Sequence, residues 1–180
     1  MTKPIAETNN DPSVDEFWQL STRFYDAPEV SRFLLALQNT QQKNINELLF
    51  ALWVSHALQI RLTDESIQRI LQAAERNKLW AANIRDTRFD LEQQWQPPYP
   101  EKIDQARQAM LHTELNIERL HQQKLVEALG EEMALHTFEK CADYEILLMH
   151  NLTACCGMPA AKSDYLQLIA LWQEFLLAQQ

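Results

Sequence analysis

Hydrophobic residues recur along most of this chain at intervals of three and four positions, the spacing of one face of an α-helix. No stretch alternates apolar and polar residues over the length of a typical β-strand. The pattern predicts seven helical segments, at residues 13–25, 28–37, 45–60, 63–95, 101–129, 131–156 and from 163 onward. We therefore expect an all-α fold, a single helical bundle of about seven helices.

The segment 45–60 differs from the others because its apolar residues cover nearly the whole circumference of the helix. A helix that is hydrophobic all round belongs inside a protein. The sequence thus predicts that the third helix is buried at the centre of the bundle. In the fourth segment Leu79 and Trp80 fall out of phase with the apolar stripe, which favours a bend there.

Capping residues and glycines set the expected helix ends. Ser13, Asn44 and Ser163 are placed to accept hydrogen bonds from the first free amides of three helices. Gly130 follows a helical pattern and suits the left-handed closing position, and Gly157 with Pro159 ends the next helix. These are the only two glycines in 180 residues, so no glycine-rich phosphate loop of the nucleotide-binding kind can be present.

The prolines at 97, 98 and 100 predict an extended elbow at 97–100, because each proline disfavours helical geometry in the residue before it. We expect residues 1–12 to form a disordered leader and 13–180 to form one domain. The leader lacks the apolar core of a secretory signal, and no apolar run is long enough to cross a membrane. These features favour a cytoplasmic protein that does not associate with membranes.

The net charge of −9 limits the partners that the chain can have. Phosphates would be repelled on average, so we expect no DNA binding and regard RNA as disfavoured. Basic and aromatic residues do interleave between residues 76 and 99, which keeps association with RNA or the ribosome through Arg76, Arg85 and Arg88 as a second alternative.

Two pairs of residues have spacings seen in metal sites. Glu118 and His121 match half of a di-metal helical motif, and Asp86 and Asp90 match half of a magnesium site for diphosphates. Neither pair has a second half elsewhere in the sequence. We therefore expect no metal and no cofactor, with Glu118 and His121 as solvated side chains on an exposed helix face.

Hydrophobic residues that the fourth helix and the elbow do not need for packing suggest a surface for a partner. The candidate interaction surface consists of Trp80, Arg85, Arg88, Trp95 and Tyr99.

The first 60 residues carry a specific pattern: Phe17-Trp18, Leu37-Gln38, and Asn44-x-Asn46 before an apolar run ending in Trp53. This part of the chain (13–60) resembles an uncharacterised proteobacterial family of short all-helical proteins of unknown function. The resemblance implies a helical proteobacterial protein and assigns no activity. In that family a glycine usually precedes the asparagine pair; here Gln42 and its neighbours stand there, which predicts a tighter or more helical loop.

Within the same region, several residues combine hydrophobic bodies with polar ends and could form a groove. The candidate groove consists of Trp18, Tyr25, Gln38, Asn46 and Trp53. The sequence favours a structural role over this groove, in which these residues lock the first three helices together, because buried amides and indoles usually serve structure. The sequence favours a non-enzymatic interaction or adaptor module that binds another protein or a second copy of itself as a homodimer. A metal-dependent or small-molecule-binding helical enzyme is the first alternative, so enzymatic activity is left uncertain, leaning towards none.

Overall fold

The computed structural model describes residues 12–179 and confirms the all-α class. The helices are α1 (Val14–Tyr25), α2 (Pro28–Gln41), α3 (Ile45–Trp53), α4 (Asp64–Gln94), α5 (Glu101–Leu135), α6 (Tyr144–Cys156) and α7 (Lys162–Leu177). A π-helical turn, η1 (Val54–Leu58), follows α3, and two short strands, β1 (Ile60–Arg61) and β2 (Glu139–Lys140), pair antiparallel. The predicted leader lies almost wholly outside the described residues.

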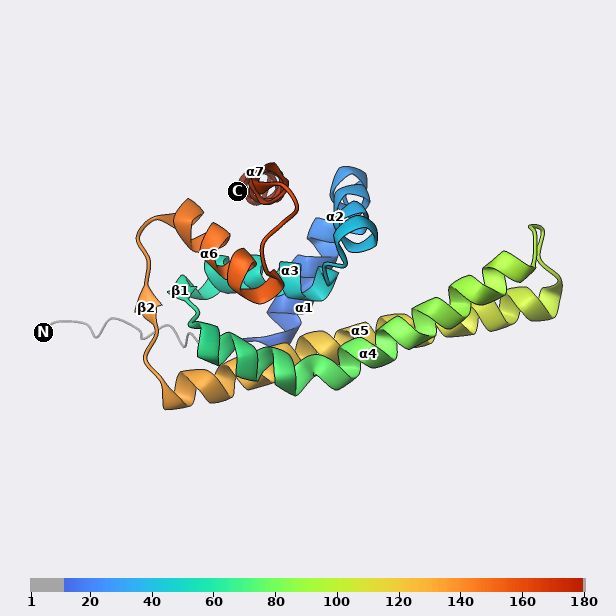
Figure 1. Ribbon diagram of the computed structural model, residues 1–180, viewed down its shortest axis with the longest axis horizontal. Helices are drawn as coiled ribbons and strands as arrows, with labels where there is room; N and C mark the ends of the chain where they lie inside the picture. The colour runs from blue at the N-terminus through green and yellow to red at the C-terminus, as the bar shows by residue number, and fades with distance from the viewer. Residues whose placement is uncertain (1–11, 180) are drawn as a thin grey trace, which may run out of the picture.

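Two parts of the molecule are distinct in Figure 1. Helices α1, α2, α3, α6 and α7 form a body, and α4 and α5 form an antiparallel hairpin that extends from it as an arm. With 31 and 35 residues, these two helices are about 46 and 52 Å long. The predicted elbow, Pro97–Pro100, lies between α4 and α5 at the tip of this arm.

Helix α3 occupies the centre of the body, and every residue from Asn46 to Trp53 is buried, which agrees with the predicted central position. Polar contacts fix α3 and the segment that follows it against their neighbours. Lys78 of α4 pairs with the buried Glu47 at 2.9 Å. The fully buried Asn151 of α6 donates to the Ser55 hydroxyl and the Ile60 carbonyl and accepts from the Leu62 amide, so α6 is tied to η1 and β1.

Several predicted helix ends are wrong. Helix α5 continues through Gly130 to Leu135, because Leu129 and Glu132 on either side of the glycine are buried and packing outweighs its low helix propensity. Helix α6 begins only at Tyr144, capped by Asp143. Helix α7 begins at Lys162, so Ser163 lies inside it rather than capping it.

Other local predictions are confirmed. The side chains of Ser13 and Asn44 accept hydrogen bonds from the amides of Glu16 and Glu47. Gly157 closes α6 with φ of +70°. The chain also places Gln42 in the left-handed conformation, φ 56°, at the end of α2, in the loop where a glycine is expected from the resemblance.

Candidate functional site

A groove of about 680 Å³ lies between the body and the arm. Five helices line it, and most of them contribute residues three or four positions apart, so that each turns one face to the same space. The lining includes Trp18, Tyr25 and Asp26 at α1, Leu35 and Gln38 of α2, Ile45, Asn46 and Leu49 of α3, Arg85, Arg88 and Phe89 of α4, and Leu111, Glu114, Leu115, Glu118 and Gln122 of α5.

Ion pairs across the arm form the charged part of the groove. Glu114 of α5 is buried and accepts hydrogen bonds from Arg85 Nε at 2.7 Å and from Arg88 Nε at 3.1 Å. Arg85 also donates to Glu118, and Arg88 donates to Glu92 at 3.1 Å. The two guanidinium groups are therefore held by carboxylates of their own chain.

Burial is the main cause of the pKa shifts of two ionisable side chains in the groove. Burial raises the pKa of Glu118, although the charge of Arg85 opposes the shift. Burial also raises the pKa of Tyr25, and the negative charge of Glu118 adds to that shift. Glu118 is thus a carboxylate with less compensating positive charge than its burial requires.

The inner end of the groove contains a buried amide with a free acceptor. Gln122 Nε2 donates to Asn46 Oδ1 at 2.7 Å, which joins α5 to the start of α3. Within residues 12–179, Gln122 Oε1 has no hydrogen-bond partner although the side chain is almost completely buried. Gln122 lies one turn beyond Glu118 on the same face of α5.

Hydrophobic side chains at the rim of the groove remain open to solvent. Phe89 is 44% exposed, Leu115 is 48% exposed, and Leu35 is also exposed. Arg88 places its guanidinium 4.6 Å from the centre of the Phe89 ring, which keeps that ring in the groove wall. Apolar residues at helical spacing around an open space are typical of sites that receive a helix.

Four of the five residues predicted as a groove, Trp18, Tyr25, Gln38 and Asn46, line this space. Trp53 does not, because it is buried in the core and stacks on Phe17 with ring centres 5.0 Å apart.

The residues of the candidate interaction surface are distributed over the arm instead of forming one patch. Arg85 and Arg88 turn inward and line the groove. Trp80 and Trp95 are exposed, but fifteen residues of helix separate them by about 22 Å. Tyr99 lies at the tip beside Arg107. Leu79 and Trp80 are exposed side chains of a continuous helix α4.

The two pairs with metal-like spacing lie in different surroundings. Asp86 and Asp90 are exposed on the arm. Glu118 is partly buried in the groove and pairs with Arg85, and His121 is only 1% exposed, so the prediction that both are solvated on an exposed helix face is wrong. Neither ring nitrogen of His121 has a partner in the described part of the chain, and burial lowers its pKa to about 4. No group of three or more His, Cys, Asp or Glu residues among those described could hold a metal ion.

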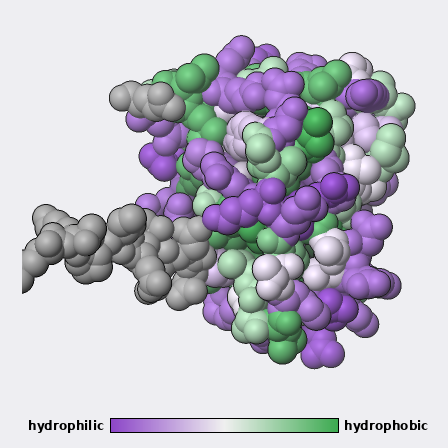
Figure 2. Space-filling model, turned by 90° about the vertical axis from the view of Figure 1, so that its left-hand side faces the viewer, coloured by the Kyte–Doolittle hydropathy of each residue, from purple (hydrophilic) through white to green (hydrophobic). Residues whose placement is uncertain are grey.

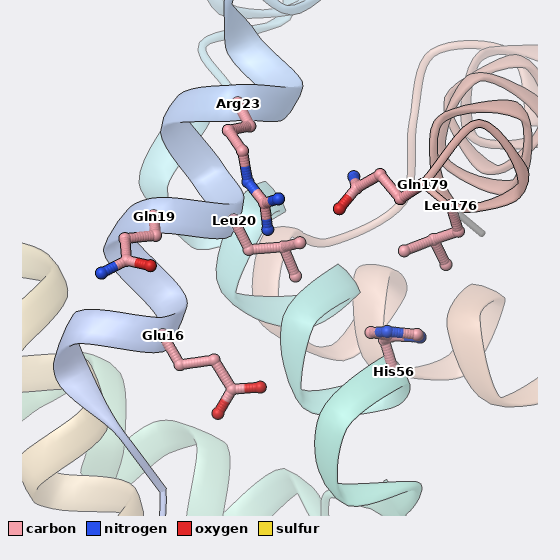
Figure 3. A pocket seen from close by; sticks show the side chains of 7 residues that line it. All are labelled: Glu16, Gln19, Leu20, Arg23, His56, Leu176 and Gln179. Carbon is pink, nitrogen blue, oxygen red and sulfur yellow. The ribbon is translucent and has the colours of Figure 1, made fainter.

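A smaller pocket of about 330 Å³ lies between α1, η1 and the end of α7 (Figure 3). Glu16, Leu20 and Arg23 point from α1 toward His56, Leu176 and Gln179. Its polar residues are all exposed, so it is a surface depression without a buried polar group to orient a ligand. Figure 2 shows the end face of the molecule, where polar side chains separate small hydrophobic areas and leave no continuous apolar patch among the described residues. The groove is therefore the better candidate site.

Sequence reasoning missed the α5 wall of the groove, Leu111, Glu114 and Leu115. The signal was present, since these residues and Glu118 follow a spacing of three, four and seven. Mixed polarity obscured it, because a carboxylate on the inward face interrupts the apolar stripe.

Comparison with known proteins identifies the family of the chain. Residues 16–125 match the model of the family described as "Protein of unknown function (DUF2390)", and the chain belongs to this family. The match reaches well past residue 60 and covers α1 to α4 and most of α5, hence all five helices that line the groove. No curated protein and no solved structure matches the chain. None of the helices in residues 12–179 combines the length and hydrophobicity that crossing a membrane requires.

Proposed function

We propose that this protein, whose family has no assigned function, is a non-enzymatic adaptor that binds an amphipathic helix of another protein in the groove between its body and its arm. The observation that carries the proposal is the lining itself: faces of five helices surround an open space, with Leu35, Phe89 and Leu115 exposed at its rim. A helix with apolar residues along one side would cover these side chains and complete the packing.

Charge distribution supports a protein partner over a nucleic acid. Arg85 and Arg88 are the cations nearest the groove, and carboxylates of α4 and α5 already neutralise them. Little positive charge is left for phosphates, whose recognition depends on unpaired Lys and Arg side chains.

Two leucines of α5 give a matched pair of variants to test the proposal. Leu115 and Leu120 are 48% and 47% exposed, and only Leu115 lines the groove. Glutamine is a good helix former, so Leu115→Gln and Leu120→Gln should fold equally well. We expect Leu115→Gln to weaken binding of the partner about tenfold, the usual effect of removing a hydrophobic anchor, and Leu120→Gln to leave it unchanged.

The measurement is affinity purification from the host with wild type and both variants, followed by titration of the helical segment of any retained protein. Support requires a protein that wild type and Leu120→Gln retain and Leu115→Gln loses, and that binds through a helix. A partner that all three forms bind equally well would contradict the proposal.

A small molecule is the second candidate occupant, which corresponds to the enzyme alternative. The groove volume falls within the range of ligand pockets, about 300–1,000 Å³, and Glu118 has the raised pKa of a possible proton acceptor. Turnover of a metabolite by wild type that Glu118→Gln abolishes would favour this function over the adaptor.

A further inference from the structure

We infer that the groove takes a basic amphipathic helix, which places a Lys or Arg side chain beside Glu118 of α5. The inference rests on the proposed function and specifies the chemistry of the partner. It depends on the hydrogen-bond acceptors in the groove, on the charge of the groove lining and on the net charge of the whole chain.

Two side chains of α5 that can accept hydrogen bonds face the groove. Glu118 and Gln122 are one turn apart on α5, and both line the groove. Arg85 donates to Glu118 Oε1, and no described residue donates to Glu118 Oε2 or to the buried Gln122 Oε1. The Gln122 oxygen is closed off from the groove, whereas the Glu118 side chain is 24% exposed, so a ligand that brings N–H groups can reach the Glu118 carboxylate. Lysine and arginine have only donors in their side chains.

The charge of the groove lining also favours a positively charged side chain. Its lining carries Arg85 and Arg88 against Asp26, Glu114 and Glu118, an excess of one negative charge (two positive, three negative). Asp26 has no ion-pair partner in residues 12–179. A positive side chain would pair with Asp26 or Glu118, whereas a carboxylate would face uncompensated negative charge.

The net charge of −9 extends this preference beyond the groove. A chain with that charge attracts cationic partners and repels anionic ones at long range, which raises the association rate of a basic helix. The raised pKa of Glu118 is consistent with this account, because a cation beside the carboxylate would offset the burial that raises it.

Model peptides can stand in for the natural partner in a test of the inference. The probes are two fluorescein-labelled amphipathic peptides of about 18 residues, long enough to form a helix, one of leucine and lysine and the other of leucine and glutamate. We expect the lysine peptide to bind by fluorescence anisotropy and the glutamate peptide to bind at least tenfold more weakly, the effect of one mismatched charge contact.

Two variants that remove the same charge locate the contact. Glu118→Gln should weaken binding of the lysine peptide about tenfold, because it removes a charge-assisted hydrogen bond. Glu131→Gln, at an exposed position of α5 outside the groove, should change it less than about twofold. Thermal melting of both variants checks that they are folded.

Equal binding of the two peptides, or equal affinity of wild type and Glu118→Gln, would overturn the inference. So would binding of the lysine peptide that Leu115→Gln leaves intact, because the peptide would then be held by the acidic surface. None of these results contradicts the adaptor itself, which fails if the natural partner binds independently of Leu115.

Discussion

Single residues of this protein include a histidine whose burial makes stability depend on pH. His121 lies inside the structure without a hydrogen-bond partner among residues 12–179, and burial, aided by the charge of Lys78, lowers its pKa to about 4. In the unfolded chain its pKa is near 6.5. Between these values the unfolded state binds a proton that the folded state does not, so acid favours unfolding.

We expect His121→Leu to remove this dependence. Relative to wild type, the free energy of unfolding of the variant should rise by about 1–2 kcal/mol between pH 7 and pH 5, the range that the shift implies. Urea unfolding at the two pH values measures it. His112→Leu, at an exposed position of the same helix, is the control and should follow wild type. A constant difference between His121→Leu and wild type would show that the histidine does not titrate in this range.

At the scale of elements, the arm is a two-helix hairpin of uneven packing. Its base contains buried residues on both helices, such as Ile70 and Leu125. From residue 82 to residue 113 no side chain is fully buried, because no third layer covers the hairpin there. Two helices without a core depend on propensity and ion pairs, which stabilise helices only weakly.

Amide hydrogen exchange should therefore be graded along the arm. We expect amides of residues 82–94 and 101–113 to exchange at least tenfold faster than those of residues 66–81 and 114–132, because opening of the outer arm breaks few buried contacts. Exchange followed by mass spectrometry on the free protein resolves these segments. Uniform protection along both helices would contradict this expectation and indicate that the outer arm is covered in solution.

The same elements show how far the sequence could predict the structure. The buried α3 and the capped starts of α1 and α3 follow from local pattern and were predicted. The continuation of α5 through Gly130 was not predicted, because the packing of the residues on either side of the glycine decides where the helix ends. Four residues that line the groove belong to the predicted set, which was selected for hydrophobic bodies with polar ends. The groove itself could not be foreseen, since it needs the angle between body and arm, which no local pattern encodes.

At the scale of the whole molecule, the arm connects two possible binding regions that the structure separates. The groove lies where the arm meets the body, and its outermost arm residues are Phe89 and Leu111. Trp95 directly follows α4 and Tyr99 lies within the Pro97–Pro100 elbow, so both lie beyond the groove at the tip of the arm. Between the two regions, Arg107 Nη1 lies 3.7 Å from Glu92 Oε1 and brings α4 and α5 together.

A shortened arm can therefore separate the two regions. Replacing residues 93–106 by a glycine-containing loop of about four residues would join Glu92 to Arg107 across a short distance. We expect the melting temperature to fall by only a few degrees, because the removed segment has no buried residue. Binding of the partner in the groove should be unchanged.

The control for the shortened arm is Trp95→Gln in the full chain, which removes the exposed indole and leaves the length of the hairpin intact. If the natural partner is lost by both the shortened chain and Trp95→Gln, but kept by Leu115→Gln, then the tip and not the groove binds it. If it is lost by Leu115→Gln alone, the outer arm is dispensable, and the junction of body and arm is the functional part of the molecule.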